Sequence, residues 1–219
     1  MPEGSQSIVH MPDGTTQAAT RMWIRNNGTG IWHGYPMPEG GNYLSFYIQA
    51  SNPKLQYEME FDNDSLSDAI ENIFPLNTES ALLVWNYISI PLSYKYDISY
   101  MMEDVLDLLF DLQEMQSGKK IIHWLPDTFR CNWTVSWENG QLEIESYWEC
   151  TAGHLEGLLN EKPVITLSIE EFISEWKEVL HTVIKGLKHC GYNEQKIGGM
   201  RKLLERYASI KEFGILYKG

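Results

Sequence analysis

The pattern of apolar and polar residues is most regular between residues 131 and 150. Cys131–Trp137 and Leu142–Cys150 both alternate with a period of two, which is typical of strands with one buried face. Asn139-Gly140 lies between them and predicts a type I′ turn that pairs Trp137 with Leu142. In this hairpin the apolar face consists of Trp133, Val135, Trp137, Leu142, Ile144 and Trp148. The opposite face consists of Asn132, Thr134, Ser136, Glu143, Glu145 and Tyr147.

Apolar residues at helical spacing predict two long helices. The first begins near Ser99 and continues to Met115, before Gly118. The second begins at Ser168, which forms a capping box with Glu171, and continues to Gly191. Shorter helices are predicted for residues 65–74, 152–160 and 194–207.

The remaining apolar runs predict strands. These are Met22–Arg25, Tyr43–Ala50, Leu55–Phe61, Ala81–Ile90, Ser93–Ile98, Lys119–Leu125 and Val164–Leu167. We expect the second and third to form a hairpin, and Ala81–Ile90 to be a single central strand. The order of strands and helices predicts an α+β fold with a largely antiparallel sheet and helices packed on one side. Residues 1–20 are polar and predict a flexible N-terminal arm, followed by a single domain over residues 21–219.

Negative charge is concentrated between Glu58 and Glu114. This stretch has thirteen carboxylates and one cation, Lys95, a net of −12 against −13 for the whole chain. Strand alternation places one acidic row on a solvent-facing side, and helical spacing places a second row on the outer side of the helix that begins near Ser99. We predict that these rows bind a partner through Glu58, Glu60, Asp62, Asp64, Glu103, Asp107, Asp111 and Glu114.

Sequence motifs for metal binding or catalysis are weak compared with this charge pattern. Glu58, Glu60, Asp62 and Asp64 could hold a hard cation, but they lack the glycine and the distal glutamate of a calcium loop, so a solvated strand face is the better interpretation. The six histidines and three cysteines have no zinc-ligand or nucleophile spacing. We therefore predict no metal, no cofactor and no catalytic residues. A Cys–His nucleophile assembled by folding stays open.

Charge and hydropathy restrict the expected partners and location. A net charge of −13 disfavours direct binding to nucleic acid, because phosphate contacts require Lys and Arg. No apolar run is long enough to cross a membrane, and the N-terminal residues do not have the pattern of a signal peptide. Three cysteines cannot all pair with one another, which favours a reducing compartment. We expect a cytoplasmic protein.

The acidic strand Glu58–Asp64, the acidic helix face Glu103–Glu114 and the hairpin WTVSWENGQLEIESYW together have a familiar layout. In composition and layout the chain resembles bacterial immunity proteins of polymorphic toxin systems. The resemblance implies a non-enzymatic inhibitor that binds a basic toxin, such as a nuclease domain. The alternatives are a metal-dependent or other enzyme with an unrecognised site, or a structural or adaptor protein with an acidic surface that maintains solubility.

Overall fold

The computed structural model describes residues 45–56 and 65–210 in full, together with the backbone of four strands before residue 45. The chain divides into two compact units, Met1–Tyr43 with Phe213–Gly219, and Leu44–Glu212. In the first unit β1 (Ile8–His10) pairs with β2 (Thr16–Ala18), and β3 (Arg21–Asn26) pairs with β4 (Trp32–Met37), both antiparallel. The predicted domain boundary at residue 20 stays a prediction.

A four-stranded antiparallel sheet forms much of the second unit. Its strands, in spatial order, are β11 (Val164–Ser168), β10 (Gln141–Thr151), β9 (Phe129–Glu138) and β8 (Ser117–Trp124). The predicted hairpin is confirmed, since Trp137 pairs with Leu142 and the turn residues Asn139 and Gly140 have φ of 53° and 78°. A bulge between Trp148 and Cys150, which the alternation did not predict, shifts the register at the far end.

The apolar face of this sheet forms the core with closely packed tryptophans. Trp133 makes edge-to-face contact with Trp124, with ring centroids 5.4 Å apart, and lies at the same distance from Trp85 of the second sheet. Gly118 lies under Trp137, where an added Cβ would be 2.3 Å from the indole ring. The predicted role of Gly118 as a helix stop is therefore wrong, because its place in β8 serves this close packing.

A second antiparallel sheet has three described strands, β5 (Phe46–Gln49), β6 (Ala81–Trp85) and β7 (Ile88–Leu92), in that spatial order. The predicted single strand Ala81–Ile90 is wrong, because the chain reverses at Asn86 and Tyr87. Both turn residues have positive φ, 44° and 71°, as a type I′ turn requires. Asparagine tolerates this region, but tyrosine rarely adopts it, so the sequence carried a weak turn signal.

Two other predicted strands also differ from the observed structure. Ser93–Ile98, expected as an edge strand, forms a π-helix over Tyr94–Ile98 that continues into α2 (Ser99–Glu114). Gln56 is not in a strand; its backbone N–H donates to the carbonyl of Ile73 at 2.9 Å. Leu55 is not in a strand either, and residues 57–61 of the predicted strand Leu55–Phe61 lie outside the described residues.

The other described helices are α1 (Leu66–Ile73), α3 (Glu156–Glu161), α4 (Ile169–Glu175), α5 (Lys177–His189) and α6 (Met200–Ser209). The predicted capping box of Ser168 with Glu171 is confirmed, and α1 is capped by Ser65, which accepts from the N–H of Asp68. The second long helix is broken at Trp176 into α4 and α5.

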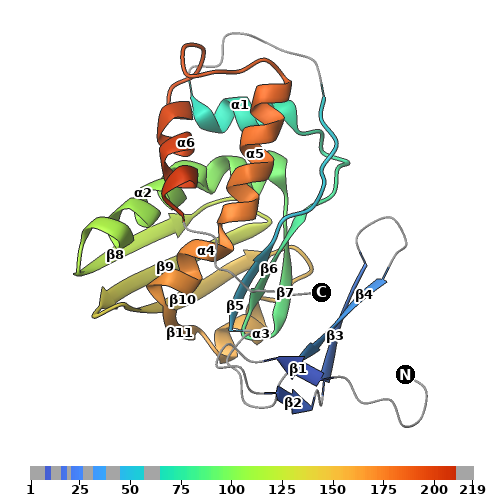
Figure 1. Ribbon diagram of the computed structural model, residues 1–219, viewed down its shortest axis with the longest axis vertical. Helices are drawn as coiled ribbons and strands as arrows, with labels where there is room; N and C mark the ends of the chain where they lie inside the picture. The colour runs from blue at the N-terminus through green and yellow to red at the C-terminus, as the bar shows by residue number, and fades with distance from the viewer. Residues whose placement is uncertain are drawn as a thin grey trace. The chain divides into compact units, whose positions relative to one another are not determined.

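The helices lie mainly to one side of the sheets. Figure 1 shows α1, α2, α5 and α6 gathered together within the second unit. Helix α4 contacts β5, β10 and β11 and so joins the two sheets. The α+β fold with antiparallel strands is confirmed. Within the described residues, no helix has both the length and the apolar character needed to cross a bilayer.

Candidate protein-binding surface

Of the two predicted acidic rows, the structure describes only the one on α2. Glu58, Glu60, Asp62 and Asp64 lie outside the described residues. The second row lies on α2 and is described completely. The site can therefore be built from α2 and from the elements that contact it.

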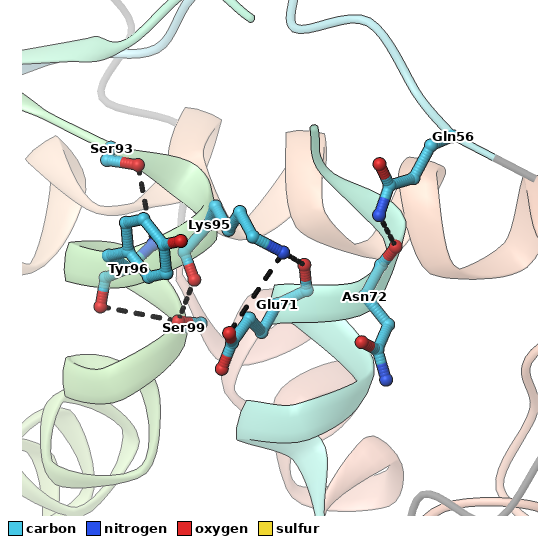
Figure 2. A network of polar contacts seen from close by, with 7 residues as sticks. All are labelled: Gln56, Glu71, Asn72, Ser93, Lys95, Tyr96 and Ser99. Carbon is cyan, nitrogen blue, oxygen red and sulfur yellow. Dashed lines mark hydrogen bonds and ion pairs between the residues drawn. The ribbon is translucent and has the colours of Figure 1, made fainter. Parts of the chain in front are cut away.

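Lys95, the one cation of the acidic stretch, contacts the end of α1 (Figure 2). Its Nζ donates to the backbone carbonyl of Glu71 at 3.0 Å and lies 4.0 Å from Glu71 Oε1. A cation beside the last carbonyls of a helix is favourable, because they carry the negative end of the helix dipole. Ser99 Oγ donates to the carbonyl of Lys95 at 2.5 Å, which ties the start of α2 to the same place. Lys95 therefore stabilises the junction of two helices.

A buried carboxyl group fixes the start of α2 from the other side. Asp97 is almost fully buried, and it accepts hydrogen bonds from the Ser93 N–H at 2.7 Å and from Thr128 Oγ1 at 2.5 Å. Burial raises the pKa of Asp97, and these two hydrogen bonds oppose that rise. Since Thr128 precedes β9, Asp97 joins the π-helix to the four-stranded sheet. Side chains projecting from the start of α2 are consequently held by a rigid support.

The outward side of α2, together with the π-helix that precedes it, carries both aromatic and acidic residues. Tyr96 and Tyr100 are 43% and 46% exposed, and Phe110 is 44% exposed. Intervals of four, three, four, three and four residues place all members on one face of the helix. The opposite face is buried in the core. We call this surface the α2 stripe; it consists of Tyr96, Tyr100, Glu103, Asp107, Phe110 and Glu114.

Cations from other parts of the chain contact the C-terminal half of α2. Lys202 Nζ of α6 lies 2.8 Å from Asp107 Oδ1, and Lys120 Nζ of β8 lies 2.6 Å from Asp111 Oδ2. These pairs relieve the repulsion between carboxylates one turn apart. Asp107 and Asp111 are therefore engaged within the chain, and their role in partner binding stays a prediction.

An arginine also contacts the stripe. The guanidinium carbon of Arg206 lies 4.7 Å from the ring centroid of Phe110, and its Nη1 donates to Gln113 Oε1 at 2.9 Å. Arginine combines stacking on an aromatic ring with directed hydrogen bonds in this way because its guanidinium is planar. The contact shows the kind of cationic side chain that the stripe accommodates.

The N-terminal half of the stripe is more open. Tyr100 and Glu103 are both exposed, and no ion pair involving Glu103 is present among the described residues. Tyr96 has Lys95 Nζ 5.6 Å from its ring centroid. Tyr100, Glu103 and the distal Glu114 therefore remain available to a partner.

The carboxylates of the stripe are among the residues predicted from the sequence, but its aromatic residues are not. Tyr96 was assigned to an edge strand, and the outward side of the helix was assessed only for charge. The signal was nevertheless present, since Tyr96, Tyr100 and Phe110 follow the same spacing as Glu103 and Asp107. Among the residues with described side chains, no cluster of three His, Cys, Asp or Glu is placed to hold a metal ion.

None of the three cysteines forms a disulfide. Cys131 lies in β9 and is buried, and this burial raises the pKa of its thiol. A raised thiol pKa disfavours the thiolate that nucleophilic chemistry needs.

Comparison with known proteins adds no relative to this picture: no family model, curated protein or solved structure matches the chain. The surfaces of the molecule are therefore the best indication of its function. Of these, the α2 stripe combines exposed aromatic rings, carboxylates and a rigid support.

Proposed function

We propose that this protein is a cytoplasmic inhibitor that binds a basic protein partner through the α2 stripe. The partner class that fits is the one implied by the resemblance to bacterial immunity proteins, a basic toxin such as a nuclease domain. The observation that carries the proposal is the presence of exposed aromatic rings and carboxylates together on one face of a helix whose start is held by Asp97 and Lys95.

Each component of the stripe has a separate effect on binding. Carboxylates attract a basic protein over long distances and raise its association rate, an effect that salt screens. Exposed tyrosines supply contact area with little loss of conformational entropy, and each cation placed over such a ring contributes about 0.5–1 kcal/mol at an exposed site. A row of carboxylates can also occupy a groove that a nuclease uses for phosphates. The combination supports inhibition by occlusion.

The first experiment identifies the partner. The tagged protein is purified from its native host, and co-purifying proteins are identified, with the product of the adjacent reading frame as the first candidate. Binding kinetics are then measured for Glu103→Lys and Tyr100→Ala. We expect Glu103→Lys to reduce the association rate several-fold at low salt, and Tyr100→Ala to raise mainly the dissociation rate.

The control is Glu178→Lys, which makes the same charge reversal at an exposed position on α5. Asp107 and Asp111 are unsuitable because their replacement breaks ion pairs within the chain. Binding that is unaffected by Glu103→Lys, by Tyr100→Ala and by salt would refute a role for the stripe.

A further inference from the structure

A second open surface lies on the four-stranded sheet, on the side opposite the tryptophan core. Strand β10 directs Glu143, Glu145 and Glu149 to this side, and all three are exposed. No ion pair to any of them is present among the described residues. On this side the neighbouring strand β9 contributes the neutral Asn132, Thr134 and Ser136, and charged residues only at its two ends, Arg130 and Glu138. We call this surface the outer sheet face.

Exposed apolar side chains surround the acidic row. Ile121 is 59% exposed, Val164 is 44% exposed and Tyr147 is 62% exposed. The strand register aligns Ile121, Thr134, Glu145 and Val164 across the four strands. Tyr147 follows Glu145 by two residues and points to the same side. Glu145 therefore lies beside the apolar Val164, is separated from Ile121 by Thr134, and has an aromatic ring along its own strand. A partner would meet a carboxylate and apolar surface together here.

The surface is hollowed beside Glu145. The hollow has a volume of about 360 Å³ and is lined by Asn132, Thr134, Glu145, Tyr147, Asn160 and Pro163. This volume lies within the range of ligand pockets, roughly 300–1,000 Å³. It is large enough to take one long side chain of a partner.

Hydrogen bonds fix the rim of the hollow. Asn160 accepts from the Trp148 N–H at 2.9 Å and donates to the Trp148 carbonyl at 2.8 Å. The Pro163 carbonyl accepts from the Ser146 N–H at 2.9 Å. Asn132 Oδ1 lies 2.6 Å from His123 Nδ1. A rim held in this way loses little conformational freedom when a ligand binds.

We propose that the outer sheet face is a docking surface for a basic protein segment, and that the hollow receives one arginine side chain. Glu145 pairs with the guanidinium, and the Tyr147 ring lies against its plane. Arginine fits better than lysine because its planar fork meets a carboxylate with two hydrogen bonds and stacks on an aromatic ring. The proposal stands on elements other than α2, so it does not depend on the proposed function of the stripe.

In the test, octa-arginine is titrated into the full-length, ¹⁵N-labelled protein and binding is monitored by NMR. The salt concentration is about 150 mM, at which weak long-range attraction is screened. We expect saturable shifts of the Asn132, Glu145 and Tyr147 amides, and an affinity at least fivefold lower for Glu145→Gln. Glu143→Gln is the matched control: it removes the same charge from the same face of β10 but lies outside this hollow, and it should weaken binding less than twofold. Octa-lysine should bind more weakly than octa-arginine.

Three results would overturn the proposal. One is the absence of shifts at the outer sheet face, including the case in which all shifts fall on α2. Another is equal weakening by the two glutamine variants, which would indicate unspecific attraction to negative charge. The third is equal affinity for the two peptides. Shifts on α2 report separately on the α2 stripe, so failure of either proposal can be recognised without the other.

Discussion

Glu175 provides a sharp test of the electrostatic reasoning. This residue ends α4, and its Oε2 accepts the backbone N–H of Ile48 in β5 at 2.9 Å. Burial raises the pKa of the Glu175 carboxyl from its ordinary value of 4.5 to about 7, and the nearby charge of Glu171 adds to the rise. The hydrogen bond from Ile48 opposes it. The folded protein thus holds a proton that the unfolded chain releases near pH 4.5.

The direction of the pH effect follows from these two pKa values. The Glu175 carboxyl stabilises the folded protein fully below pH 4.5, where it is protonated. This stabilisation declines as the pH rises from 4.5 to about 7, and it changes no further above pH 7. The difference of about 2.5 in pKa corresponds to roughly 3.4 kcal/mol in the free energy of unfolding as an upper bound. Because the carboxyl retains some contact with solvent, we expect about 1–2 kcal/mol.

The variant that isolates this effect is Glu175→Gln. Glutamine has the same shape, stays neutral at every pH and can accept the Ile48 N–H, so it removes only the ionisation. We expect equal free energies of unfolding for wild type and variant near pH 4.5, and a variant that is more stable by about 1–2 kcal/mol at pH 8. The measurement is urea unfolding at pH 4.5, 6, 7 and 8, with the exposed Glu178→Gln as control. A difference that does not grow between pH 4.5 and 8 would show that Glu175 ionises normally in the folded state.

Three further predictions concern packing, charge and backbone conformation. Gly118→Ala should lower the free energy of unfolding in urea by about 1–3 kcal/mol, because the new methyl group would meet an indole ring. Gly157→Ala, with no atom within 4 Å of the added Cβ, should not destabilise the protein. A double-mutant cycle with Asp107→Ala and Lys202→Ala should give a coupling of about 0.2–1 kcal/mol that vanishes in 1 M salt; a salt-independent coupling would contradict a surface ion pair. Tyr87→Gly should raise the free energy of unfolding by about 0.5–1 kcal/mol, and with it the thermal midpoint, because this exposed residue has φ of 71°. A lower midpoint would mean that the tyrosine ring stabilises the protein by more than the backbone strain costs.

Local signals that agreed with one another predicted structure reliably. The hairpin over residues 131–150 followed from its alternation and from Asn139-Gly140, two independent indications of one register. The helices that begin after Ser65 and Ser168 followed from capping side chains that act within one turn. The turn at Asn86 and Tyr87 was missed because only the backbone shows its left-handed conformation, in a run of otherwise apolar residues. The break at Trp176 was missed because the apolar stripe continues through it without glycine or proline.

The candidate site was predictable in part for a similar reason. The spacing of Glu103 and Asp107 is local and visible in the sequence. Their neutralising partners are not local, since Lys202 comes from a helix near the other end of the described chain and no periodicity relates it to Asp107. The hollow at Glu145 depends on Asn160, whose position beside β10 arises from hydrogen bonds across a turn and a short helix.

The pairing of α6 with α2 also has a consequence for biosynthesis. Lys202 and Arg206 leave the ribosome roughly 90 residues after the α2 residues that they contact, a delay of about 5–20 seconds at ordinary translation rates. During that interval Lys120 can already pair with Asp111, but Asp107 and Phe110 have no cation from α6. The nascent protein therefore exposes a more negative α2 than the finished one, and completion of α6 is the step that sets the final charge of this surface.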